Sequence, residues 1–189
     1  MEKRNYFKNW EYSYNRQEKE QIIKWKKMKN LILMVSIILT SLTMNSQIKV
    51  YKGISSYSGD ILCNISNGKV YKKTSLYSGD IICNIIGSKI YKGTSTYSGD
   101  VLYNIADGKV YKGTSSYSGD IVMTIKDGKV YKGASSYSGD VIATIRDGKI
   151  YTGNSSYSGD ISFTINGNVS IEEFVAIWHA VKYSYWLKL

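Results

Sequence analysis

Residues 109–128 read KVYKGTSSYSGDIVMTIKDG, and near-copies of this 20-residue unit fill the chain from residue 49 to residue 168. The six copies are 49–68, 69–88, 89–108, 109–128, 129–148 and 149–168. Eight positions are identical in all six; in the first copy they are Lys49, Tyr51, Ser55, Tyr57, Ser58, Gly59, Asp60 and Ile65. Such a fixed period is typical of a repeat architecture in which one local environment is built several times.

Each copy predicts a β-hairpin. Ile121, Met123 and Ile125 occupy alternate positions, which predicts a strand with one buried face. A shorter strand is expected at residues 110–111. Asp-Gly pairs such as Asp107-Gly108 predict the tight turn that joins a long strand to the next unit's short one. The other connection, Gly-x-Ser-x-Tyr-Ser-Gly-Asp, predicts a polar loop whose tyrosine folds back onto the sheet.

The fold class that follows is all-β. Single hairpins of this size are marginal in water, so the six units of residues 47–168 must stack as a solenoid or close into a ring to bury their apolar faces, such as that of Ile61, Cys63 and Ile65. Residues 169–189 form a separate C-terminal element. There a capping-box pattern, Ser170 with Glu173, predicts an amphipathic helix over residues 170–185. We expect that helix to cap the end or mouth of the array; a helix facing a membrane or a partner is the alternative.

The N-terminal 46 residues differ from the repeats. Lys26, Lys27 and Lys29 precede the uncharged run 31–44, which predicts a signal peptide at residues 28–46 that is removed after Ser46. The run is shorter than the roughly 20 residues of a membrane span, so an uncleaved anchor is the alternative. If translation starts at Met28, residues 1–27 are an upstream extension. The repeats are then expected to be secreted, periplasmic or on the cell surface.

The net charge of +10 is divided along the chain. Residues 1–27 carry +4, Lys29 adds one, and residues 47–189 carry +5. Within the repeats each lysine alternates with glycine, tyrosine and aspartate, so we interpret the lysines as solvated strand edges and expect no nucleic-acid partner.

The repeated pattern Ile/Val-Tyr-Lys-Gly-x-Ser-x-Tyr-Ser-Gly-Asp-Ile/Val, ending in IEEFVAIW at residues 171–178, resembles the bacterial four-fold β-flower proteins over residues 48–183. The resemblance implies hairpins around a rotation axis in a closed or near-closed ring, and it carries no activity or catalytic residues. This chain departs from it in having six units, and Lys73 stands where the first unit has Gly53. The Asp-Gly-Lys-Val-Tyr-Lys-Gly stretch is also similar to MORN repeats, and the 20-residue aromatic period is similar to choline-binding repeats.

Two recurrent side chains are candidates for binding. The aspartates could line a ring that holds a cation such as calcium, or each could stabilise its own turn; they are Asp60, Asp80, Asp100, Asp120, Asp140 and Asp160. The loop tyrosines could present aromatic platforms to sugars or cations, or pack between repeats; they are Tyr57, Tyr77, Tyr97, Tyr117, Tyr137 and Tyr157.

The remaining reactive residues are few. Cys63 and Cys83 share one position, which we interpret as apolar core, and could form a disulfide if their Cα atoms lie within about 7 Å. His179 is the only histidine; it lies on the predicted helix, and we expect it to have a helix-packing or surface role. No catalytic residue and no cofactor is predicted, because catalysis needs an asymmetric constellation.

We therefore expect an exported, non-catalytic structural or binding module whose repeated loops bind a glycan or a cell-surface protein by multivalency. Membrane contact is expected only through an uncleaved signal segment. The alternative is a calcium-dependent site or an enzyme built on the repeated aspartates.

Overall fold

The computed structural model describes residues 21, 24–32 and 47–186. The chain divides into two units, residues 1–44 and 45–189. In the first, residues 24–32 are helical; most of the predicted signal peptide lies outside the described residues. Within the described part of the chain, no helix combines the length and the apolar character that a membrane crossing requires.

The second unit contains twelve strands and one long helix. The strands are β1 Ile48–Lys52, β2 Ile61–Ser66, β3 Lys69–Lys72, β4 Ile81–Ile86, β5 Lys89–Lys92, β6 Val101–Ala106, β7 Lys109–Lys112, β8 Ile121–Lys126, β9 Lys129–Lys132, β10 Val141–Arg146, β11 Lys149–Thr152 and β12 Ile161–Asn166. The helix is α2, Ile171–Trp186. Each predicted unit therefore supplies one short and one long strand, as expected.

The strands close into an antiparallel barrel in which every strand pairs with its neighbours in sequence and β1 pairs with β12. The seam has the same contacts as the other junctions. Thr164 Oγ1 donates to the carbonyl of Gly53 at 2.7 Å, and Thr144 Oγ1 donates to that of Gly153 at 2.8 Å. The expectation of a ring-like array is confirmed, and the open solenoid is not formed.

The predicted hairpin turns are confirmed. Asp107 and Gly108 both have left-handed backbone, with φ of 51° and 72°. Two consecutive left-handed residues match the twist of a two-residue hairpin, which explains the Asp-Gly pairs. A Cβ at Gly108 would lie 2.6 Å from the carbonyl oxygen of Ile125, so the turn also needs a residue without a side chain.

A β-bulge in each unit changes the predicted burial. On β4, Cys83 pairs with Val70 and Ile81 pairs with Tyr71, which leaves Ile82 unpaired. Ile82 and Cys83 consequently both belong to the interior cluster, whereas Ile81 and Tyr71 do not. A bulge places two successive residues opposite one, so simple alternation fails there. The prediction that Ile61 shares a face with Cys63 and Ile65 is wrong for this reason: Ile61 is buried outside the interior cluster.

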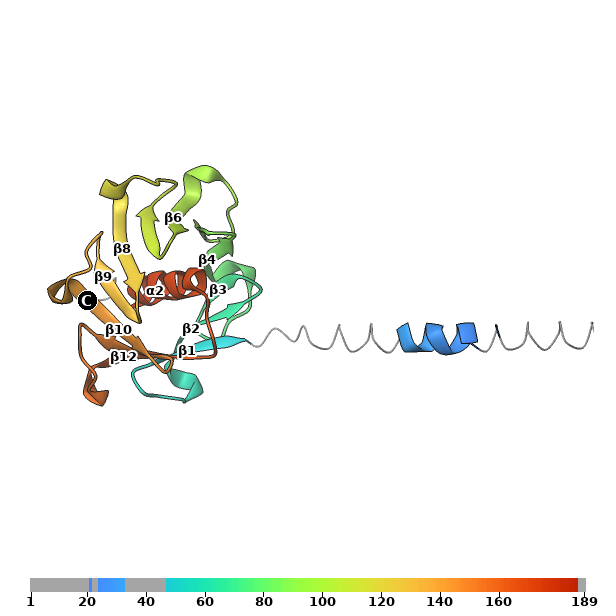
Figure 1. The fold of residues 1–189 in the computed structure, drawn as a ribbon. Coiled ribbons are helices and arrows are strands. Elements are labelled where there is room, and N and C mark those ends of the chain that lie inside the picture. The colour runs from blue at the N-terminus through green and yellow to red at the C-terminus, as the bar shows by residue number, and fades with distance from the viewer. Residues whose placement is uncertain (1–20, 22–23, 33–46, 187–189) are drawn as a thin grey trace, which may run out of the picture. The chain divides into compact units, whose positions relative to one another are not determined.

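The predicted C-terminal helix and its capping box are confirmed. Glu173 Oε2 accepts from the Ser170 backbone N–H at 2.9 Å, and Ser170 Oγ accepts from that of Glu173 at 3.2 Å. Figure 1 shows the helix surrounded by the ring of strands. Residues 174–177 are four consecutive buried positions. Since successive helical residues point about 100° apart, α2 is buried on every side there.

The helix packs closest to one side of the barrel, where the interior side chains are small. α2 packs against β2, β3, β4 and β5, where the long strands β2 and β4 carry the small residues Cys63 and Cys83. The Cys83 thiol lies 3.8 Å from the carbonyl oxygen of Ala176. On β12 the equivalent residue is Phe163, whose ring centroid lies 6.3 Å from that of Trp178. A small side chain lets the helix approach, and a large one fills the remaining space.

Candidate functional site

Six equivalent loops project from the barrel, one between the short and the long strand of each unit. We call them petals; they are residues 53–60, 73–80, 93–100, 113–120, 133–140 and 153–160. Each is held from below by a polar side chain of a neighbouring long strand. Asn84 Nδ2 donates to the carbonyl of Ser95 at 2.7 Å, and Thr124 Oγ1 donates to that of Gly133 at 2.8 Å. Sequence analysis missed this support, although Asn or Thr occupies that position in all six units.

Every petal carries a clamp around its tyrosine. In the first petal, Ser55 Oγ accepts from the Tyr57 backbone N–H at 3.2 Å and donates to Asp60 Oδ2 at 2.6 Å. The Asp60 backbone N–H donates to the Tyr57 carbonyl at 3.0 Å. The same three hydrogen bonds recur in the other five petals. The tyrosine backbone is therefore fixed on both sides, with φ between −82° and −77° in all copies.

The clamped tyrosines point into solvent. Their side chains are 78–80% exposed, and they are Tyr57, Tyr77, Tyr97, Tyr117, Tyr137 and Tyr157. The prediction that the loop tyrosine folds back onto the sheet is wrong. The strand tyrosines fill that place instead: Tyr51, Tyr71 and Tyr111 are buried where β1, β3 and β7 pair with the long strands.

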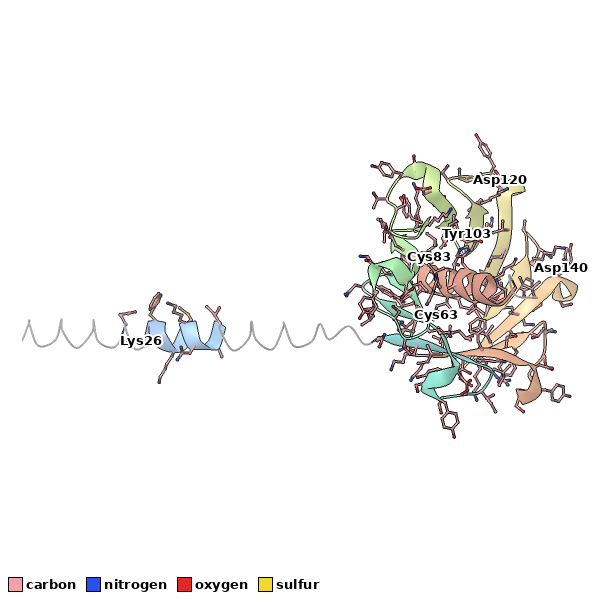
Figure 2. The ribbon with its side chains drawn as sticks, turned by 180° about the vertical axis from the view of Figure 1, so that it is seen from behind. Lys26, Cys63, Cys83, Tyr103, Asp120 and Asp140 are labelled. Carbon is pink, nitrogen blue, oxygen red and sulfur yellow. The ribbon has the colours of Figure 1, made fainter. Side chains whose placement is uncertain are left out.

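The structure does not bring the six petal aspartates into one ring. Each carboxylate is bound by the serine of its own petal, and α2 lies within the ring of strands. Figure 2 shows Asp120 and Asp140 at the outer edge, far from the helix. Among the described residues, no group of three or more His, Cys, Asp or Glu is placed to hold a metal ion. The geometry matches the turn-stabilising interpretation, with a serine hydroxyl as the donor.

The two cysteines line the interior beside α2 (Figure 2). Both are free thiols, so the disulfide considered from the sequence is not formed. β3 lies between their strands, which separates the Cα atoms by about two strand spacings, roughly 9.6 Å. That distance exceeds the reach of a disulfide. Burial raises the pKa of Cys83 to about 12, and burial together with the nearby Cys83 raises the pKa of Cys63. Both thiols are therefore neutral and poorly reactive.

His179 lies in the barrel interior rather than in a petal. Its Nδ1 lies 3.3 Å from the hydroxyl of Tyr103, and the two rings meet edge to face at 5.6 Å. Burial, and then the charge of Lys182, lower the pKa of His179. Burial, and then Cys83, raise the pKa of Tyr103. The recurrent serines lie on the outside of the barrel, so the described residues do not combine them with this histidine.

Comparison with known protein families gives a match over the repeats and part of the helix. A family model described as "6-fold beta flower protein" matches residues 50–178, from β1 into α2. Neither a curated protein nor a solved structure matches the chain. The match corrects the resemblance to four-fold proteins, and its symmetry agrees with the six hairpins that close the barrel.

Proposed function

Because the chain belongs to the six-fold beta flower family, we propose that it is an exported, non-catalytic binding module that presents one surface six times around a closed barrel. The single observation that carries the proposal is the set of six clamped tyrosines, each 78–80% exposed. The family description itself names a symmetry and no activity.

The clamp is what makes these tyrosines suitable for binding. A side chain this exposed buries little apolar surface and contributes little to folding. Yet in each petal a serine hydroxyl and an aspartate carboxylate hold the tyrosine backbone in place. A preorganised aromatic side chain loses less conformational entropy when a ligand binds, and tyrosine has only two rotatable χ angles to order.

Six equal sites suit a ligand that repeats. Each petal alone offers one exposed aromatic ring and binds weakly, but a polymer or a dense surface can engage several petals at once. Linked weak sites can reach an avidity 10² to 10⁴ times greater than the single-site affinity. Export follows from the interpretation of residues 28–46 as a signal peptide, and N-terminal sequencing should find a mature chain that begins near Gln47.

The binding proposal is tested by the number of tyrosines. Variants with Tyr→Ala in none, two, four or all six petals would be incubated with envelopes of the cells that make the protein, and the retained fraction measured. We expect the apparent affinity to fall steeply with each pair of tyrosines removed, because each linked site multiplies the overall avidity. Ser116→Ala, at an exposed petal position beside Tyr117, is the matched control and should change nothing. Retention that survives loss of all six tyrosines would refute the proposal.

A further inference from the structure

The petals also indicate which chemical class they bind. We infer that each petal tip, residues Tyr57 to Asp60 and their equivalents, is a subsite for one ring of an uncharged polysaccharide. This inference rests on the proposed function, since it names the ligand of the same six sites.

The first argument is a glycine that folding does not require. Gly59 follows Tyr57 and Ser58, and its equivalents are Gly79, Gly99, Gly119, Gly139 and Gly159. None of the six has a positive φ. A Cβ added to any of them would meet no atom within 4 Å. Neither backbone conformation nor crowding inside the protein therefore explains glycine there. A Cβ there would project into open space, two residues along the chain from the exposed tyrosine, and that space is available to a ligand.

The second argument is the chemistry of the tip. The tyrosine ring offers a flat apolar face, which suits the C–H face of a sugar ring. Asp60 belongs to the same turn as Tyr57, because the Asp60 backbone N–H donates a hydrogen bond to the Tyr57 carbonyl. Only Oδ2 is engaged by Ser55, and the residue is exposed. A carboxylate can accept several hydrogen bonds, so it can take hydroxyl groups of a sugar stacked on the ring.

The surroundings favour a glycan over a protein or a polyanion. The shared neighbours of each tyrosine are serine, glycine and aspartate, whereas the core of a protein interface is depleted of serine and aspartate. Large exposed aliphatic side chains occur in two petals, as Ile54 and Leu76. The petals also carry no net positive charge: their charged side chains are the six aspartates and Lys73, so a polyanion gains little from them.

The test exploits the unexplained glycine. A variant with all six tip glycines changed to alanine should be as stable as the wild type or more stable, because alanine restricts the unfolded chain. Its unfolding midpoint in urea is therefore the folding control. We expect its retention on envelopes to fall roughly 100-fold, through six weakened subsites. The variant with Tyr→Phe in all six petals keeps the aromatic face and should retain most of the affinity.

The ligand class is read from the same envelopes after two treatments. Periodate, quenched before protein is added, cleaves vicinal diols of sugars, whereas a protease removes exposed proteins. We expect periodate to abolish retention and protease to leave it unchanged. An array of neutral polysaccharides should in turn be bound by the wild type and not by the glycine-to-alanine variant.

The outcomes separate this inference from the proposed function. Tyrosine-dependent retention that resists periodate and is lost to protease overturns the sugar subsite and leaves the binding module standing. Unaltered retention of a stable glycine-to-alanine variant also overturns the subsite. Failure of the wild type to bind either envelopes or the array overturns both.

Discussion

Alkaline pH should destabilise the barrel through its two interior thiols. Cys63 and Cys83 are fully buried and are the only cysteines of the chain. Burial raises the pKa of Cys83 from its ordinary value of 9.0 to about 12 and also raises the pKa of Cys63. The folded state thus keeps both protons at a pH where the unfolded chain releases them. The stabilisation is complete below about pH 9 and is lost as the pH rises toward the folded pKa.

The loss of stability can be calculated from the difference between the thiol pKa values of the folded and unfolded states. At pH 10, one unit above the ordinary value, ionisation stabilises each unfolded thiol by about 1.4 kcal/mol, while the folded thiol remains protonated. Two such thiols amount to about 2.8 kcal/mol. Typical domains have a free energy of unfolding of about 5–15 kcal/mol, so the loss is a large part of the total.

Urea denaturation at pH 7, 9 and 10 measures this loss of unfolding free energy, with the Cys63→Ala/Cys83→Ala double variant as reference. Alanine is compatible with this position, because Ala143 occupies it in the fifth unit. All other side chains are the same in the two proteins, so the comparison isolates the two thiols together with the effect of Cys83 on the pKa of Tyr103. The wild type should lose about 2.8 kcal/mol more than the double variant between pH 7 and pH 10. Parallel pH curves for the two proteins would refute the reasoning, since they would mean that the thiols ionise equally in the folded and unfolded states.

Three further substitutions test the fold by thermal or urea unfolding. Ile177→Ala, in the buried part of α2, should cost about 2–5 kcal/mol, while Ile54→Ala, at a position 70% exposed, should cost almost nothing; equal effects would place α2 outside the barrel. Lys73→Gly should stabilise by up to about 1 kcal/mol, because Lys73 has a φ of 49° where the other five units have glycine; a loss of stability would show that the lysine side chain outweighs its backbone strain. Thr164→Val and Thr144→Val should each cost about 1 kcal/mol if the β1–β12 seam is closed like the other junctions, and a much smaller cost at Thr164 would mean an open ring.

The hairpins and their turns could be predicted from the sequence because they depend on local chemistry. Asp107-Gly108 specifies a left-handed turn whatever surrounds it, and Ser170 with Glu173 specifies a helix start. The position of α2 could not be predicted in the same way. Its pattern of apolar residues suits a helix at the end of the barrel as well as a helix inside it. Whether a helix fits inside depends on the radius of the closed ring, which follows from its twelve strands.

The bulge and the tyrosines show a second limit of sequence reasoning. Ile81, Ile82 and Cys83 are all apolar, so the sequence does not reveal that Ile82 has no partner on β3. It therefore does not reveal either that Ile81 faces away from the interior. Tyr51 and Tyr57 are equally invariant among the repeats, yet the first is buried and the second is exposed. Tyr51 packs where β1 pairs with β2, whereas Tyr57 lies in a loop whose backbone is held by the Ser55 clamp, and the residue type alone does not distinguish the two places.

The distribution of differences among the six copies supports a role for the petals. The interior position of Cys63 differs in almost every unit, because each copy meets a different side of the single helix α2; its occupants are Cys63, Cys83, Tyr103, Met123, Ala143 and Phe163. Two exposed petal positions also differ: Ile54 corresponds to Asn154 in the last unit, and Ser56 to Leu76 in the second. The copies have thus diverged both where packing demands it and where solvent permits it. The exposed tyrosine and the glycine two residues after it have not diverged, although the tyrosine lies in solvent and a Cβ at the glycine would meet nothing within 4 Å. A ligand that contacts every petal in the same way, as proposed above, would supply the constraint that folding does not.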